Sequence, residues 1–169
     1  MIVWPILRWP ARPGALRAER DAAITDSRGL PTMNASLVYL SRTGHSRRIA
    51  EAIAAELQIP AQSIQTSPKL SGVDLLFIVG GIYAGKSDPR MVEYVEKLDS
   101  GMVKRVVLIT SCASRKNKQD VVRDALVRNG IEVVPDEFIC RGNFLFVGAG
   151  HPNAKDIDDA ISFVRKVTK

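Results

Sequence analysis

The chain has 169 residues, 46% of them hydrophobic and 25% charged, which is typical of a soluble globular protein with one domain. No apolar run reaches the roughly 18 residues that a membrane span needs. The net charge of +6, from 24 basic and 18 acidic residues, is spread along the chain without a known nucleic-acid-binding module around it. We therefore expect neither a membrane span nor a nucleic-acid partner, whereas an acidic protein partner or an anionic ligand stays open.

Residues 1–34 differ from the rest of the chain. Prolines and an arginine interrupt the first apolar residues, so they do not make the continuous core of a secretory signal. The segment then becomes rich in Arg, Ala and Gly, and we interpret it as a disordered arm before a folded domain over residues 35–169. Two other interpretations stay open: a working start at Met33, or an arm that docks on the domain through Trp4 and Trp9.

From residue 36 onward, apolar strands alternate with helical patterns. Strands are predicted over residues 36–40, 61–66, 74–79, 104–109 and 131–140, with Pro135 interrupting the last. Helices are predicted over residues 44–57, 89–98 and 117–128, and after Asn153. Unbroken apolar strands are expected where both faces are buried, so this alternation predicts a parallel sheet with helices on both faces.

Loops of small residues follow the first, third and fourth predicted strands. Ligands of such sheets bind at the carboxyl ends of the strands, where the strand order reverses. In a 2-1-3-4-5 order, this point lies between strands one and three. We therefore expect the three loops to meet at one edge of the sheet.

The first of these loops carries hydroxyl groups at Ser41, Thr43 and Ser46 and leads directly into a helix. The first turn of a helix leaves backbone N–H groups without partners, and the helix dipole adds partial positive charge there. Small hydroxyl side chains beside such N–H groups form a cradle for phosphate. The loop therefore predicts a site for the phosphate of a mononucleotide, and the alternative is a serine-rich helix cap.

The segment Ser41-Arg42-Thr43-Gly44-His45-Ser46 resembles the phosphate loop of flavodoxins, Ser/Thr-x-Thr-x-x-Ser/Thr, at all three hydroxyl positions. The resemblance covers residues 36–168, and this length is similar to that of the short-chain flavodoxins. It implies a three-layer α/β sandwich around a five-stranded parallel sheet in the order 2-1-3-4-5. It also implies a non-covalently bound FMN whose phosphate lies on residues 41–46.

The same resemblance assigns the flavin ring to the second and third loops. Glycines in the second loop permit close approach of the backbone to the ring. Tyr83 is the candidate for stacking on the flavin, and the alternative is a tyrosine that packs on its own loop. The ring-binding residues implied are Gly81, Ile82, Tyr83, Ala84, Gly85, Thr110, Ser111, Cys112, Ala113 and Ser114.

The third loop departs from the family pattern. Electron-transfer flavodoxins carry an aromatic residue and acidic residues there, whereas this chain continues with Arg115 and Lys116. Phe144 or Phe146 is then a candidate to cover the second face of the ring. These basic residues also disfavour binding of the partners that usually recognise the acidic surface of a flavodoxin.

Three functions fit these features. The first is an FMN electron carrier with redox partner proteins, and the second is a flavin-dependent NAD(P)H:quinone-type oxidoreductase. The third is a binding module that has lost the flavin, which the three retained hydroxyl groups disfavour. We predict the carrier, without an assigned oligomeric state.

The two cysteines, Cys112 and Cys140, lack the C-x-x-C spacing of metal sites, so no metal site is predicted. Two reduced cysteines favour a cytoplasmic location.

Overall fold

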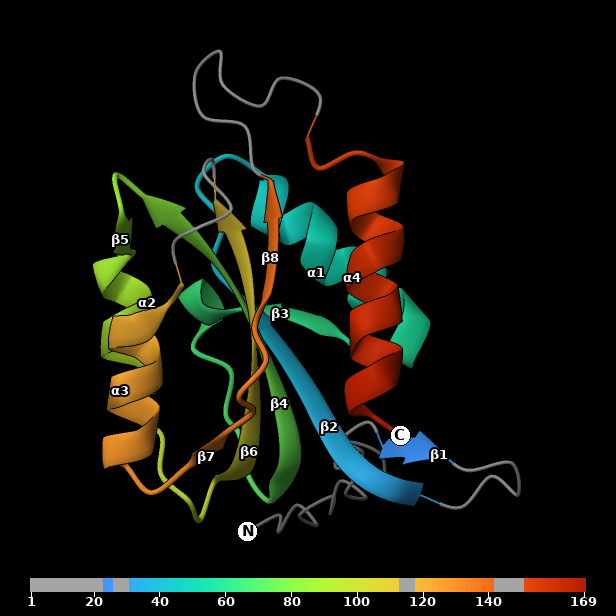
Figure 1. Ribbon diagram of the computed structural model, residues 1–169. Helices are drawn as coiled ribbons and strands as arrows, with labels where there is room; N and C mark the ends of the chain where they lie inside the picture. The colour runs from blue at the N-terminus through green and yellow to red at the C-terminus, as the bar shows by residue number, and fades with distance from the viewer. Residues whose placement is uncertain (1–22, 26–30, 113–117, 142–150) are drawn as a thin grey trace, which may run out of the picture.

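The computed structural model describes residues 23–25, 31–112, 118–141 and 151–169. These residues form three layers, with a twisted sheet between two pairs of helices (Figure 1). Helices α1 (His45–Leu57) and α4 (Ala154–Val167) cover one face, and α2 (Pro89–Val95) and α3 (Asp120–Arg128) cover the other. No helix within the described ranges is long and apolar enough to cross a membrane.

The parallel strands of the sheet are β3 (Ala61–Ser63), β2 (Pro31–Tyr39), β4 (Val73–Tyr83), β6 (Val103–Cys112), β7 (Glu132–Val133) and β8 (Phe138–Arg141). They lie in the order β3-β2-β4-β6, and β7 and β8 both pair with the far side of β6. With β7 and β8 taken as one interrupted strand, this order is 2-1-3-4-5. The predicted α/β fold class is confirmed.

Both faces of the central strands are buried, as their unbroken apolar sequences predict. In β4, Leu76 and Ile78 belong to the hydrophobic cluster that includes residues of α2 and α3. Their neighbours Leu75 and Phe77 belong to the cluster on the other face, which includes residues of α1 and α4. This alternation follows from the two-residue period of side chains along a strand.

The third and fourth parallel strands run further than predicted. The prediction ended them at residues 79 and 109, whereas β4 continues to Tyr83 and β6 to Cys112. The two extensions pair with each other, Gly80 with Thr110 and Gly81 with Ser111. Residues 80–83 and 110–112, predicted as loop, are therefore strand, because a neighbouring strand supplies hydrogen bonds that no local pattern reveals.

Other elements are shorter than predicted. The second parallel strand ends at Ser63 rather than residue 66, because the Ser63 side chain accepts a hydrogen bond from the Gln65 N–H and starts a 3₁₀ turn, Ile64–Thr66. The fifth strand is broken between β7 and β8 at Pro135, which has no N–H to donate. Helix α2 ends at Val95 rather than residue 98, and α3 begins at Asp120 rather than residue 117.

The boundary of the predicted arm also moves. Strand β2 begins at Pro31 rather than residue 36, and β1 (Ala23–Thr25) pairs with it in antiparallel orientation. Residues 31–34, assigned to a disordered arm, therefore belong to the sheet, where Met33 packs against the hydrophobic cluster beside α1. Trp4 and Trp9 lie outside the described residues.

Candidate functional site

The first predicted loop lies where β2 ends and α1 begins, at the carboxyl edge of the sheet (Figure 1). The Leu40 N–H donates to the Val79 carbonyl at 3.0 Å, which holds the start of the loop against β4. Gly44 is the N-cap residue of α1 and has a φ of 87°, a conformation that other residues rarely adopt. Among the described residues, apart from the two chain neighbours of Gly44, no atom lies within 4 Å of the position where a Cβ would stand on Gly44, so space is open above the loop there.

The three hydroxyl groups of this loop do not serve as the helix cap, since that position belongs to glycine. Ser41 Oγ accepts a hydrogen bond from the Gly44 N–H at 3.0 Å, and Thr43 Oγ1 lies 3.1 Å from His45 Nδ1. Ser46, in the first turn of α1, is buried. The structure therefore gathers Ser41, Thr43 and Ser46 around the start of one helix.

The backbone of the same turn can donate to an anion. The first hydrogen bond within α1 joins the Arg48 N–H to the Gly44 carbonyl. The N–H groups of His45, Ser46 and Arg47 precede it and have no acceptor inside the helix. With the helix dipole behind them, these groups suit a phosphate.

The second predicted loop is a β-hairpin rather than an open loop. Strand β4 turns at Ala84 and Gly85, which have φ values of 49° and 78°, into the antiparallel strand β5 (Lys86–Ser87). Positive φ at both central residues is typical of a two-residue hairpin turn. Gly81 and Ile82 are buried in β4, so only the hairpin tip is exposed.

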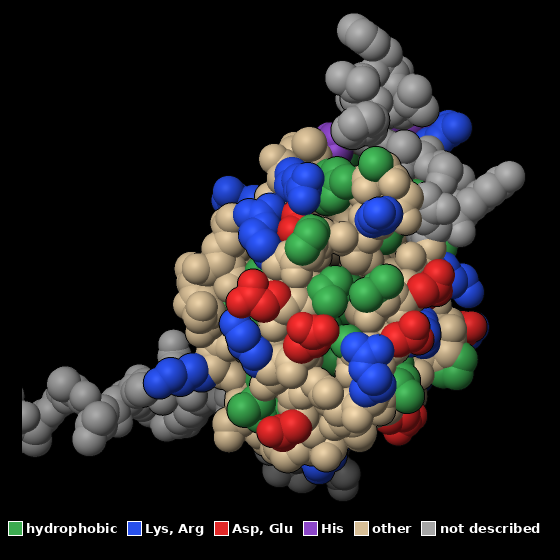
Figure 2. Space-filling model, turned by 90° about the vertical axis from the view of Figure 1, so that its left-hand side faces the viewer, with side chains coloured by type: hydrophobic (Ala, Val, Ile, Leu, Met, Phe, Trp, Pro, Cys, Tyr) green, Lys and Arg blue, Asp and Glu red, His purple; other side chains and the backbone are tan. Residues whose placement is uncertain are grey.

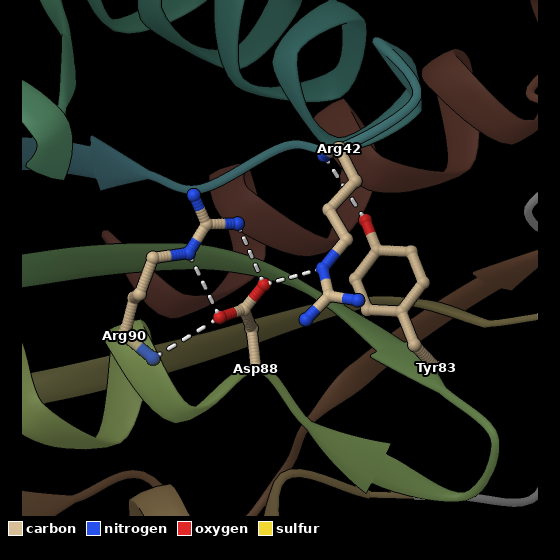
Figure 3. Close-up of polar contacts among 4 residues, drawn as sticks. All are labelled: Arg42, Tyr83, Asp88 and Arg90. Carbon is tan, nitrogen blue, oxygen red and sulfur yellow. Dashed lines mark hydrogen bonds and ion pairs between the residues drawn. The ribbon is translucent and has the colours of Figure 1, made fainter.

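Tyr83 joins the hairpin to the first loop. Its hydroxyl group accepts a hydrogen bond from the Arg42 N–H at 3.2 Å, and the Arg42 guanidinium lies 4.6 Å from the ring centre (Figure 3). A Cβ on Gly81 would lie only 2.7–2.8 Å from atoms of this ring, so the ring packs directly against the Gly81 backbone. The glycine is therefore needed for the close approach of Tyr83 to the first loop.

The Asp88 carboxylate binds two arginine side chains beside the contact between Tyr83 and the first loop (Figure 3). The carboxylate, of which only 3% is exposed, accepts from Arg42 Nε at 2.6 Å and from Arg90 Nη2 at 2.9 Å and Nε at 3.1 Å. Asp88 also caps α2 by accepting from the Arg90 N–H at 3.0 Å. The Arg90 guanidinium, together with that of Arg42, holds the pKa of Asp88 far below its usual range.

The pairing of Asp88 with Arg42 was not predicted. Asp88 is the N-cap residue of α2, and Pro89 follows it at the first helical position. The pairing joins residues 46 positions apart, so no local pattern could reveal it. Two guanidinium groups share one carboxylate, and the cluster keeps a net positive charge beside the first loop.

A buried polar network lies at the end of β6. The Glu137 side chain, which is fully buried, accepts from Thr110 Oγ1 at 2.6 Å, from the Gln119 N–H at 3.0 Å and from Arg123 Nη2 at 3.5 Å. Gln119 Nε2 donates to Thr110 Oγ1 at 2.9 Å, and its side chain packs on Gly80, where a Cβ would meet Gln119 Oε1 at 2.5 Å. The network links β6 to Gln119, the residue before α3, although residues 113–117 separate them in the sequence.

The structure describes only some of the residues predicted to border the ring from the third loop and beyond it. Thr110, Ser111 and Cys112 are buried in β6, and the Thr110 hydroxyl group already serves Glu137 and Gln119. A role for Thr110 at the flavin would therefore use its backbone. Other predicted residues lie outside the described ranges: Ala113, Ser114, Phe144 and Phe146.

Two hollows border the site. A polar hollow of about 310 Å³ lies on the β3 side of the first loop, and its lining includes Ser41, Gly44 and Thr66. A larger groove of about 590 Å³ lies between the hairpin, α2 and α3, and its lining includes Pro89 and Val121. The hairpin therefore has the first loop on one side and an open apolar groove on the other.

Together, the sheet with helices on both faces and the loop with open donor groups at its switch point define a doubly wound α/β protein, a class in which ligands bind at that point. A family model described as a flavodoxin domain matches residues 36–144. The chain belongs to the flavodoxin family.

Solved structures show the same fold. Oxidised flavodoxin 1 from Bacillus cereus is 17% identical with a TM-score of 0.63, over 79% of this chain and 96% of that one. A flavodoxin from the domain Archaea is 16% identical with a TM-score of 0.62, over 80% and 99%. The NAD(P)H:quinone oxidoreductase from Methanothermobacter marburgensis is 11% identical with a TM-score of 0.56, over 80% and 98%. A search of curated protein sequences finds no match.

The donor groups of the first loop fit the phosphate of a flavin mononucleotide. Backbone N–H groups at the start of α1, the nearby hydroxyl groups and the net positive Arg42–Asp88–Arg90 cluster all favour an anion. Arg42 stands at a position that varies within the phosphate loop, and here it brings a cation next to that loop. Among the described residues, no group of three His, Cys, Asp or Glu side chains could hold a metal ion.

Proposed function

We propose that the protein binds FMN non-covalently and carries electrons between redox proteins. The observation that carries this proposal is the contact between the first loop and the β4–β5 hairpin, made by Arg42 and Tyr83 at the switch point between β2 and β4. When bound, FMN supplies one-electron redox chemistry. The chain's own residues bind and orient it.

In this proposal the first loop holds the phosphate through Ser41, Thr43 and Ser46 and through N–H groups of the turn. The ring lies beside the hairpin tip, Tyr83-Ala84-Gly85, and the carboxyl end of β6. Gly85 and Gly81 support this placement because they let the backbone and the Tyr83 ring approach closely. Residues 110–114 would border the ring from the other side.

Flavin binding by the purified protein tests the proposal directly. Protein mixed with FMN and separated from excess cofactor should be yellow, and its flavin fluorescence should differ from that of free FMN. FAD and riboflavin serve as controls, since riboflavin has no phosphate for the first loop. Protein that stays colourless after mixing with FMN would contradict the proposal.

Replacing Thr43 by alanine should weaken FMN binding by about 1–3 kcal/mol, because the phosphate loses one charge-assisted hydrogen bond and one of its oxygens is left unpaired. Titration of flavin fluorescence measures the dissociation constant. Thr43→Ser is the matched control, because it keeps the hydroxyl group and should retain most of the affinity. Equal affinities for the wild type and Thr43→Ala would mean that the phosphate lies elsewhere.

Replacing Tyr83 by phenylalanine should leave FMN binding unchanged or strengthen it by up to about tenfold. The reason is that the Tyr83 hydroxyl group occupies the Arg42 N–H, a donor that the phosphate would use, while the ring itself is retained. Tyr94→Phe is the control, since Tyr94 donates to the Pro68 carbonyl far from this edge. Tenfold weaker binding by Tyr83→Phe alone would instead assign the hydroxyl group to cofactor binding.

A second function, a flavin-dependent NAD(P)H:quinone-type oxidoreductase, is supported by the apolar groove beside the hairpin. A quinone needs an open apolar space near the ring, and this groove borders Gly85 and Lys86. Steady NAD(P)H-dependent reduction of a quinone by the FMN-loaded protein alone would favour the enzyme. Without such turnover, the carrier function is retained.

We also propose a cytoplasmic location for the carrier. Cys112 and Cys140 are the two cysteines of the sequence and both are buried, and so low a cysteine content suits a reducing compartment.

A further inference from the structure

Exposed cations surround the carboxyl edge of the sheet, where the cofactor would bind. We call them the basic rim: Arg42, Arg47, Arg48, Lys86, Arg90 and Lys118. They come from the first loop, the first turn of α1, the hairpin, the start of α2 and the segment before α3. Chain segments far apart in sequence therefore bring charge of one sign to one edge.

Acidic side chains at this edge do not neutralise the positive charge of the basic rim. Asp88 and Glu137 are buried and already bonded to arginine side chains. Exposed acidic side chains near this edge include Glu51, which pairs with Arg47, and Asp120 in the first turn of α3. Asp158 and Asp159 are also exposed, at the start of α4, where Asp159 pairs with Lys155. The rim therefore keeps a positive excess toward solvent.

Figure 2 shows how basic and acidic side chains are distributed on the face formed by α2 and α3. Lys and Arg side chains gather in its upper part, toward the carboxyl edge, with almost no acidic atoms among them. Acidic side chains lie across the middle and lower part, where they alternate with basic ones. Charge is therefore unevenly distributed on this face, although basic residues are spread along the sequence.

The groove of about 590 Å³ opens within this region. Pro89, Val92 and Val121 supply apolar lining, and Val121 is 55% exposed. Lys86 and Lys118 line the groove on the rim side. Its acidic lining is Glu93 and Glu96 on the side of α2 and Asp120 at the start of α3. An apolar centre with charged side chains around it is typical of a transient protein interface.

We propose that the basic rim and this groove form the docking surface for an acidic redox protein. The inference rests on the proposed function, because it concerns how the carrier meets its partner. An acidic partner would be drawn to the rim by long-range attraction and oriented with its redox centre toward the cofactor edge. A basic partner would be repelled from the same edge.

Two electron-transfer proteins of opposite charge provide the first test. The FMN-loaded, reduced protein is mixed with an acidic [2Fe–2S] ferredoxin or with a basic cytochrome c, and complex formation is measured by titration calorimetry at low and high salt. The ferredoxin should bind at low salt and lose about tenfold or more in affinity at high salt, as the charges are screened. Equal or tighter binding of cytochrome c would overturn the proposal.

Two double variants distinguish the effect of charge at the basic rim from the effect of the protein's net charge on ferredoxin binding. Lys86→Glu with Lys118→Glu reverses charge beside the groove, at residues outside the proposed cofactor contacts. Lys69→Glu with Arg128→Glu makes the same change in net charge at exposed residues toward the opposite end of the sheet. The first variant should weaken ferredoxin binding at least tenfold at low salt and the second about twofold or less. Equal losses in both would overturn the proposal.

FMN content and affinity are measured for every variant before the docking experiment. Both double variants should keep the wild-type FMN affinity, so that a change in ferredoxin binding reports docking alone. If the protein does not bind FMN, the proposed function fails. If it binds FMN but shows no salt-sensitive preference for ferredoxin, only the docking proposal fails.

Discussion

Replacing Asp88 by alanine is expected to lower the free energy of unfolding by about 2–4 kcal/mol. The change removes the cap of α2 and the buried acceptor of two guanidinium groups. Because the Arg42 and Arg90 side chains are 46% and 50% exposed, they can turn to water, and this limits the loss. Urea unfolding of the wild type and the variant measures the difference.

Asp88→Asn separates the two roles of this residue, since asparagine caps a helix well but carries no charge. We expect it to recover about 1 kcal/mol of the loss, the part that comes from the cap. Glu93→Ala, which removes an exposed ion pair with Lys97, is the control and should cost less than about 0.5 kcal/mol. A loss below 1 kcal/mol in Asp88→Ala would contradict this role for the cluster.

The stabilisation from the Asp88 charge should disappear in acid. Its pKa in the folded protein lies far below the roughly 3.9 of an unfolded aspartate. The contribution is therefore complete above the unfolded value and is lost as pH falls toward the folded one. The difference in stability between wild type and Asp88→Asn should shrink by about 1 kcal/mol from pH 7 to pH 3 in urea unfolding. A constant difference would contradict the lowered pKa.

Replacing Glu137 by alanine is expected to cost about 3–5 kcal/mol of stability, the largest effect that we predict. Three donors lose their acceptor inside the protein: Thr110 Oγ1, the Gln119 N–H and Arg123 Nη2. Arg123 still donates to the Val134 carbonyl at 2.9 Å, so its guanidinium would stay partly buried without the carboxylate that balances its charge. Thermal and urea unfolding measure the loss.

Glu137→Gln keeps the shape of the side chain and should cost about 2 kcal/mol, because its amide cannot accept from every donor. Glu132→Gln in β7 is the matched control, since Glu132 is exposed, and it should change stability by less than about 0.5 kcal/mol. If Glu137→Gln is as stable as the control, the network contributes little to the junction between β6 and α3.

The existence of most strands and helices could be predicted because their signals are local. The apolar run in β4 and the periodic apolar residues of α1 decide element type within a few neighbours. Where elements end depends on other segments. The Gly80–Thr110 and Gly81–Ser111 pairs extend β4 and β6 into stretches whose small residues alone indicate loop.

The first loop is the part of this protein that its sequence determines, together with the fold class. Its hydroxyl groups, Gly44 and the start of α1 lie within six residues, so the geometry follows from helix-terminus rules. Only the tertiary structure decides what surrounds that loop. Asp88 meets Arg42, and Glu137 meets Thr110, across the strand order of the sheet, because buried charges take the partners that the fold brings to them.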